Sequence, residues 1–249
     1  MKKIFAILLL ALCAFGAELK VAAAANVAVV ANELKKAFAK THPNDSVEIT
    51  LASSGKLVAQ IKNGAPFELF MAANVDFAKS LSNDGFGVGE VAVYAKGKVA
   101  LFSVRGVDLS KGLQSLKNAK IKTIVIANPK TAPYGTASMQ AMQNAKIYDE
   151  IKSKIIYAGS IGEALSQTIS AADIGFVAGS ALYDEKMSKF KEGKDYIFID
   201  STLYEPIAQA MVITKKGENS KLAKEFYDFI LSQDAKAIFA KYGYESVSY

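Results

Sequence analysis

The sequence has 249 residues, of which 51% are hydrophobic, and its 30 basic and 24 acidic residues give a net charge of +6. It is long enough for one large domain or for two lobes of about 100 residues each. The modest positive charge, without any run of five or six basic residues, argues against a nucleic-acid partner, and one histidine and one cysteine argue against a zinc site or a histidine-based triad.

The N-terminus has the layout of a secretory signal peptide. A basic start (residues 1–3) precedes an apolar run (residues 4–15) and the small pair Gly16-Ala17. This run is shorter than the roughly 20 apolar residues that cross a bilayer, so we expect export to the periplasm, with cleavage after residue 16 or 17. Cleavage would remove Cys13 and two lysines, which lowers the basic residues from 30 to 28 and the net charge to +4.

Short apolar runs then alternate with helical patterns, as in βαβ units built around a sheet. We expect strands at residues 19–24, 47–52, 67–72, 91–104, 123–127, 155–158, 174–177 and 207–214. We expect helices near residues 29–38, 57–61, 75–81, 136–145 and 161–169, a turn at the glycines of residues 85–89, and one long amphipathic helical region over residues 220–242.

Two of the expected strands are long and bracket the middle of the sequence, at residues 91–104 and 207–214, so they are candidates for crossing between two lobes. We therefore predict an α/β fold with two lobes, each a mixed sheet flanked by helices, and a ligand cleft between them. The predicted division is a signal peptide (residues 1–17), lobe 1 (residues 18–97 plus 206–249) and lobe 2 (residues 98–205). The helical region at the C-terminus should pack back on lobe 1.

Four strand-to-helix junctions have the composition of an anion-binding site. They are Ala24-Ala25-Asn26, Ser53-Ser54-Gly55, Pro133-Tyr134-Gly135-Thr136 and Gly159-Ser160-Ile161-Gly162. A helix start leaves backbone N–H groups unpaired and carries partial positive charge, so a small oxyanion can dock there without a lysine or arginine. For any single junction, ordinary helix capping, here by Ser54, is the simpler interpretation. Because open α/β sheets bind ligands beyond the carboxyl ends of their strands, four such junctions suggest one shared site.

Each junction would contribute to that site through particular groups. Ser54 offers both a hydroxyl and a free backbone N–H. Tyr134 would contribute its N–H while its ring walls the pocket, and Ile161 can contribute only its N–H. The candidate ligand-binding residues are therefore Ala25, Asn26, Ser54, Gly55, Tyr134 and Ile161.

A catalytic interpretation of the same region also exists. Ser53 and Lys56 fit the S-x-x-K spacing of penicillin-binding proteins, but no K-T-G triplet occurs in the sequence. The glycines of residues 85–89 lack the third spacing of a dinucleotide-binding motif and precede a strand. We therefore predict no catalytic residues and no enzyme activity, and keep a secreted serine hydrolase using Ser53 and Lys56 as the alternative from another class.

Several segments that together span the mature chain carry the pattern of one family. They are Ala24-Ala25-Asn26, residues 53–57 with Gln60-Ile61, residues 63–73, Pro133-Tyr134-Gly135, residues 174–177 and residues 237–244. In these segments the sequence resembles the periplasmic molybdate-binding proteins, the substrate-binding components of molybdate ABC transporters, which belong to the type II periplasmic binding protein family. The resemblance implies a two-lobed periplasmic-binding-protein-like fold.

The resemblance also implies how a ligand is held. Asn26, the hydroxyl and N–H of Ser54, and the backbones of Tyr134 and Ile161 would contact an oxyanion, so that molybdenum is held as molybdate and not by metal-ligating side chains. Tungstate would bind as well, and no separate cofactor is implied. The implied partner is the membrane permease of an ABC transporter, and we expect a monomer.

This chain departs from the family pattern at two positions. Ala25 stands where many members have a serine, which places the chain with the members whose donor comes one residue later, at Asn26. Ala178 stands where some members have a ligand-binding tyrosine, and Tyr134 would fill the space that this tyrosine leaves.

The chemistry of the predicted donors suits molybdate. Molybdate is a dianion at neutral pH, so a pocket that only donates hydrogen bonds matches it, whereas the proton of hydrogen phosphate would lack an acceptor. Sulfate has the same charge and is smaller, so fixed donors would fit it less well. A site for sulfate, thiosulfate or another tetrahedral oxyanion stays open as the alternative within the same class.

Overall fold

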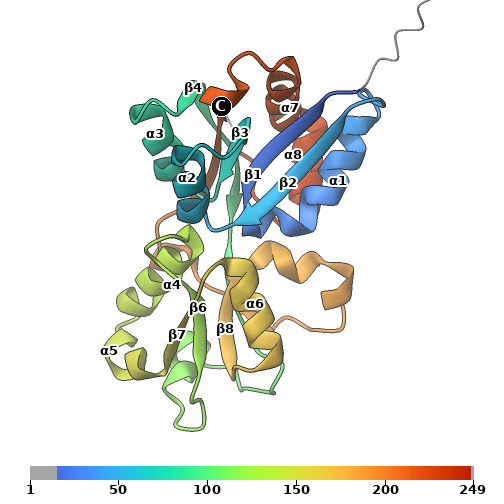
Figure 1. Ribbon diagram of the computed structural model, residues 1–249. Helices are drawn as coiled ribbons and strands as arrows, with labels where there is room; N and C mark the ends of the chain where they lie inside the picture. Colours follow the sequence, from blue (N-terminus) through green and yellow to red (C-terminus); the bar gives the residue numbers. More distant parts are fainter. Residues whose placement is uncertain (1–15, 248–249) are drawn as a thin grey trace, which may run out of the picture.

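The computed structural model describes residues 16–247. Two five-stranded sheets flanked by helices form two lobes, which lie one above the other in Figure 1. In the described part of the chain, no helix is long and apolar enough to cross a membrane. The predicted signal peptide lies outside the described residues except for its last two positions.

The sheet of lobe 1 has the strand order β2-β1-β3-β10-β4. Its strands are β1 (Glu18–Ala24), β2 (Ser46–Ala52), β3 (Leu69–Ala72), β4 (Gly87–Gly97) and β10 (Ile207–Thr214). β1 pairs in parallel with β2 and β3, whereas β10 runs antiparallel to β3 and β4. Its helices are the short 3-10 helix η1 (Ala25–Val27), α1 (Ala28–Ala39), α2 (Ser54–Lys62), α3 (Val75–Asn83), α7 (Lys221–Leu231) and α8 (Gln233–Lys241).

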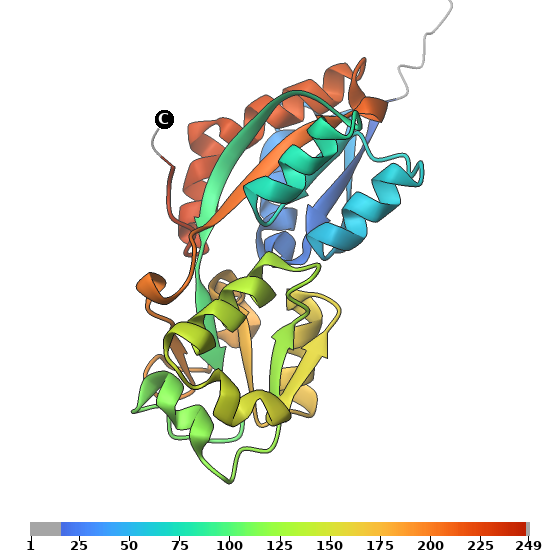
Figure 2. The same ribbon diagram turned by 90° about the vertical axis from the view of Figure 1, so that its left-hand side faces the viewer.

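Helices cover both faces of this sheet (Figures 1 and 2). On one face Leu34 and Phe38 of α1 pack with Phe226 of α7, and on the other face α2 and α3 contribute Leu57 and Leu81. These side chains recur at helical spacing because each helix buries only one stripe. β1 is enclosed from both sides, so its sequence is apolar almost throughout instead of alternating.

The sheet of lobe 2 repeats this arrangement, with the strand order β7-β6-β8-β5-β9. Its strands are β5 (Val99–Phe102), β6 (Ile124–Ala127), β7 (Ile155–Ala158), β8 (Ile174–Ala178) and β9 (Tyr196–Phe198). β6 is parallel to β7 and β8, and β5 is antiparallel to β8 and β9. The helices are α4 (Pro133–Asn144), α5 (Tyr148–Ile151) and α6 (Ile161–Ser170), with the 3-10 helices η2 (Gly112–Lys117), η3 (Lys152–Lys154), η4 (Gly179–Tyr183), η5 (Glu185–Met187) and η6 (Ser201–Leu203); η7 (Lys215–Gly217) follows β10.

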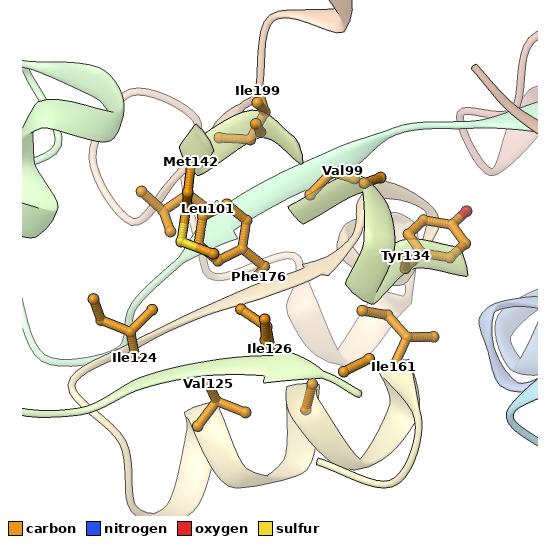
Figure 3. Packing of buried hydrophobic residues seen from close by; sticks show 14 of the residues in the cluster. Val99, Leu101, Ile124, Val125, Ile126, Tyr134, Met142, Ile161, Phe176 and Ile199 are labelled. Atoms are coloured by element: carbon orange, nitrogen blue, oxygen red, sulfur yellow. The ribbon is translucent and has the colours of Figure 1, made fainter. Parts of the chain in front are cut away.

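The main hydrophobic cluster of lobe 2 reaches the boundary with lobe 1. Figure 3 shows Tyr134 and Ile161 at the end of this cluster nearest the blue ribbon of lobe 1. The cluster continues into lobe 1 through Ala24 and Ala73. Ala24 is the last residue of β1, and Ala73 directly follows β3. The ends of strands from both lobes therefore meet at one place.

The single long strand predicted at residues 91–104 is wrong. The chain forms β4 in one sheet and β5 in the other, with Lys98 between them, and it returns from β9 to β10 through residues 199–206. Only Lys96-Gly97-Lys98 separates the apolar runs of β4 and β5, but the hydrogen-bond partners of the two strands lie in different lobes. The sequence pattern alone could not show that change of partner.

Two further predictions need correction. The glycine-rich segment is only partly a turn, since Gly87 already begins β4. The long C-terminal helical region is broken at Ser232, whose hydroxyl accepts a hydrogen bond from the Ala235 N–H (3.3 Å) and so starts a second helix. Both helices do pack on lobe 1, as predicted, through Phe226 and Phe239.

Candidate functional site

A small cavity lies where the two lobes meet. It is lined by Ala24, Ala25, Asn26, Ser53, Ser54, Ala73, Ala132, Pro133, Tyr134 and Ile161, which come from both lobes. Its volume is about 10 Å³, which is the scale of a single water molecule and far below the several hundred Å³ of pockets for organic ligands. All four predicted junctions therefore contribute to a single cavity.

Helix starts surround this cavity. η1 begins at Ala25, α2 at Ser54, α4 at Pro133 and α6 at Ile161. The first N–H groups of a helix have no partner within it, and in the described residues none of the N–H groups of Asn26, Ser54, Tyr134 and Ile161 donates to a loop carbonyl. The positive ends of several helix dipoles thus converge on one small space.

The hydroxyl of Ser54 is fixed by a contact from a neighbouring strand end. Ser54 is fully buried, and its Oγ accepts a hydrogen bond from the backbone N–H of Ala73 (3.0 Å). Since this bond uses the oxygen as acceptor, the hydroxyl hydrogen is left to donate elsewhere. Ser54 can therefore direct both its O–H and its N–H toward a guest.

Asn26 is held by a network that sequence reasoning missed. Its Nδ2 donates hydrogen bonds to Gln209 Oε1 and to Tyr244 Oη, each at 2.9 Å. Both amide hydrogens are thereby used, so the only free donor of Asn26 is its backbone N–H. Its Oδ1 is buried without a hydrogen-bond partner among the described residues. Gln209 lies in mid-strand and gave no sequence signal; Tyr244 belongs to the C-terminal family segment, which was the one available clue.

The lobe 2 groups are placed by packing and capping. Pro133 is the first residue of α4, where its missing N–H costs nothing, and Tyr134 follows with its ring in the hydrophobic cluster. The Ser160 hydroxyl accepts from the Glu163 N–H (3.2 Å) and the Glu163 carboxylate accepts from the Gly159 N–H (2.9 Å), an arrangement like a capping box that fixes where α6 begins. Ile161 therefore presents its N–H at a defined position.

The Tyr134 hydroxyl points away from the cavity toward the crossing between lobes. It lies beside the Gln209 amide and the backbone of Gly97, and within the described residues it forms no hydrogen bond of normal geometry. Burial raises the pKa of this phenol well above its ordinary value. The ring packs in the hydrophobic cluster, and Tyr134 borders the cavity at the start of α4.

Two candidate residues contribute less than predicted. Gly55 does not line the cavity, and its N–H donates to the Thr131 carbonyl of lobe 2 (2.9 Å), so it joins the lobes instead of facing a guest. Ala25 does line the cavity, with a methyl side chain that cannot donate a hydrogen bond. Gly162 lies close to Ala25. A Cβ atom added to Gly162 would be 3.6 Å from the Ala25 Cβ, which is an ordinary van der Waals contact.

The cavity lining offers neither charged groups nor a serine–lysine pair in contact. No lining residue carries a charge, and residues 16–247 contain no cluster of three His, Cys, Asp or Glu side chains that could hold a metal ion. Ser53 Oγ is buried without a hydrogen-bond partner among the described residues, and the Lys56 side chain is exposed. The pair therefore lacks the contact that a serine–lysine hydrolase needs.

Comparisons with known proteins agree with this site and fold. The model of a family described as bacterial extracellular solute-binding protein matches residues 19–245. The molybdate-binding protein ModA of Azotobacter vinelandii is 36% identical over 239 residues (95% of this chain, 93% of that protein), and ModA of Rhodobacter capsulatus is 34% identical over 241 residues (94% and 91%). The solved periplasmic molybdate-binding protein of Azotobacter vinelandii matches with a TM-score of 0.85 and 35% identity over 92% of this chain and 100% of that chain.

These matches confirm the predicted family resemblance and the two-lobed α/β fold. They cover nearly the whole chain, including all four junctions around the cavity. The relatives are binding proteins, so the prediction that the chain is not an enzyme also stands. The chain belongs to the family of bacterial extracellular solute-binding proteins, together with the molybdate-binding ModA proteins.

Proposed function

We propose that this protein captures molybdate in the periplasm and delivers it to the membrane permease of an ABC transporter. The observation that carries the proposal is the small uncharged cavity at which helix starts from both lobes converge. Two relatives that each cover more than 90% of this chain are molybdate-binding proteins, and three of the four junctions lie in segments that resemble this family.

The donor set accounts for the choice of anion. Backbone N–H groups of Asn26, Ser54, Tyr134 and Ile161 and the Ser54 hydroxyl supply five donors. Each is worth about 2 kcal/mol toward a charged acceptor, and dehydration of the dianion and lobe closure subtract from the total, so we expect micromolar or tighter affinity. No lining carboxylate competes with the anion or accepts a proton from it.

Closure of the lobes would report occupancy to the permease. Since the donors come from both lobes, the anion stabilises the closed arrangement over any open one, and a permease that recognises the closed form would select loaded protein. Tungstate, which matches molybdate in charge and nearly in size, should bind as well, and the binding unit is a monomer.

Isothermal titration of the purified mature protein tests this function. Molybdate and tungstate should bind with a stoichiometry of one and similar affinity, and sulfate and thiosulfate should bind at least about a hundredfold more weakly, because fixed donors cannot contract around a smaller ion. Sulfate binding as tight as molybdate binding would replace molybdate by sulfate as the ligand. Absence of binding to all four anions would overturn the proposal.

A further inference from the structure

The most highly connected polar residue at the cavity is Asn26, and its bonds run away from the cavity. Its side chain donates to Gln209 Oε1 and Tyr244 Oη (2.9 Å each). Its own carbonyl oxygen accepts from the Tyr244 hydroxyl (2.9 Å) and from the Ser180 hydroxyl (3.2 Å). All four residues are buried. Side chain and main chain of Asn26 are therefore both held in place.

Tyr244 makes two of these bonds at once. The hydroxyl accepts from the Asn26 side chain and donates to the Asn26 carbonyl, which forms a closed ring of hydrogen bonds around one residue. Burial raises the pKa of Tyr244 to about 12, so the phenol keeps its proton and can serve as donor throughout the physiological range. A phenylalanine at this position could make neither bond.

The segment that carries Tyr244 is itself fastened beside the crossing between lobes. The backbones of Glu245 and Lys96 exchange two hydrogen bonds (3.0 and 2.9 Å), and the Lys98 ammonium pairs with the Glu245 carboxylate (2.9 Å). β4 ends at Gly97, between the two lysines. The C-terminal segment thus joins the crossing strand to the residue that borders the cavity.

We infer that Tyr244 and Gln209 are positioning residues of the anion site, which hold Asn26 so that its backbone N–H points at the guest. The inference rests on the proposed function. Donors that are already oriented bind an anion without the cost of being ordered, and they discriminate between ions of different size better than mobile donors do. The C-terminal segment is therefore part of the binding apparatus, although it does not line the cavity.

The matched pair Tyr244→Phe and Tyr94→Phe tests this inference. Tyr94 is also buried and packs on the same ring, Phe239, with centroid distances of 5.2 Å for Tyr94 and 5.4 Å for Tyr244. Its hydroxyl makes a single long bond to the Ala72 carbonyl (3.5 Å) and none to Asn26. Tyr244→Phe should raise the Kd for molybdate about tenfold, whereas Tyr94→Phe should stay within about twofold of wild type.

Two readouts separate positioning from a general loss of stability. First, Tyr244→Phe should lower the ratio of molybdate to sulfate affinity, because loosened donors adapt to the smaller ion, whereas simple destabilisation affects both anions alike. Second, in an Asn26→Ala background, Tyr244→Phe should cost only about threefold, because its bond to the Asn26 side chain is already lost and only the bond to the carbonyl of residue 26 remains. A purely structural role predicts the full tenfold loss in both backgrounds.

The outcomes distinguish this inference from the proposed function. If wild-type protein binds molybdate and Tyr244→Phe binds it equally well, or Tyr94→Phe loses as much affinity as Tyr244→Phe, the positioning role is wrong and the function stands. An unchanged molybdate-to-sulfate ratio in Tyr244→Phe would also reject it. If wild-type protein binds no molybdate, the proposed function fails, and the inference fails with it.

Discussion

The two sides of the cavity are built in different ways. On the lobe 1 side, side chains are tied by specific hydrogen bonds: Ala73 donates to Ser54, and Gln209 and Tyr244 hold Asn26. On the lobe 2 side, Tyr134 and Ile161 place their side chains in the hydrophobic cluster (Figure 3), and both residues stand at helix starts that border the cavity. The lobe 1 side therefore depends on side-chain identity, and the lobe 2 side depends on packing.

Ser54→Ala should have the largest effect and directly tests the lobe 1 side. The substitution removes one donor to the anion and leaves the Ala73 N–H without its partner, so we expect molybdate affinity to fall by about 1.5 to 3 kcal/mol, and the free energy of unfolding of the ligand-free protein to fall by about 1 kcal/mol. Titration calorimetry and urea unfolding measure the two effects.

The neighbouring serine supplies the control for that prediction. Ser53 lines the same cavity, but no described residue fixes the orientation of its hydroxyl, whereas the Ala73 N–H fixes that of Ser54, so Ser53→Ala should change the Kd less than about threefold. Equal losses at both positions would show that the Ser53 hydroxyl is also a donor to the anion, and wild-type affinity in Ser54→Ala would show that the site is placed wrongly.

Gly97→Ala tests the close contact of the crossing strand with Tyr134 of lobe 2 and Gln209 of lobe 1. A Cβ atom on Gly97 would overlap the Tyr134 hydroxyl and lie 2.9 Å from its Cζ and 3.0 Å from Gln209 Nε2. We expect a loss of about 1 to 2 kcal/mol in molybdate affinity from this crowding, with circular dichroism unchanged because both sheets can still form. Adding Tyr134→Phe removes the overlapping oxygen and should recover part of the loss.

Gly162→Ala is the control for crowding between lobes. A Cβ atom there has no neighbour closer than 3.6 Å, so affinity should stay within about twofold of wild type. If Gly97→Ala binds as tightly as Gly162→Ala, the close approach of Tyr134 to the crossing strand does not matter for binding.

Ile161→Val should have a smaller effect on binding and sharpens the contrast between the sides. The substitution keeps the backbone N–H and removes one methylene group from the cluster, so we expect the Kd to change less than about twofold and the free energy of unfolding to fall by about 0.5 to 1.5 kcal/mol. A large loss of affinity measured by titration would mean that the side chain, and not only the backbone, contacts the anion.

The smallest expected effect is that of pH. No lining residue ionises near neutral pH, so the Kd for molybdate should be constant between about pH 6 and 9. Burial raises the pKa of Tyr244 to about 12 and that of Tyr134 well above 10, so the folded state holds these protons more tightly than the unfolded chain does. The contribution of these two tyrosines to stability should therefore be constant below about pH 10 and be lost as the pH rises from about 10 to 12, which thermal unfolding across pH would detect.

The convergence of the four junctions on one cavity could be predicted from the sequence, because this prediction needed only local features. Ser54, Tyr134 and Ile161 each follow an apolar strand and precede a helical pattern, and the ends of strands in open α/β sheets converge. A contact between the lobes explains one failure. Gly55 stands at the same helix start as Ser54, but its N–H donates a hydrogen bond to the carbonyl of Thr131, which lies in a loop of the other lobe.

The support of the lobe 1 side could not be predicted in this way. Asn26 is separated from Gln209 by 183 residues and from Tyr244 by 218 residues, and no periodicity or spacing relates positions so far apart. The division of the predicted strand around Lys98 has the same cause, since only the pairing partners differ between β4 and β5. Local chemistry could be inferred from the sequence, whereas contacts that depend on how the chain returns on itself could not.

The hydrogen bond between Asn26 and Tyr244 also has a consequence for the order in which the chain is synthesised and folds. A polypeptide made from its N-terminus carries every helix start of the cavity well before it carries Tyr244. Full capacity to capture the anion would thus arise only when almost the entire chain is available to fold. A product truncated by a few residues at its end would keep the cavity lining but lose the support of Asn26, so faulty copies should be poor carriers.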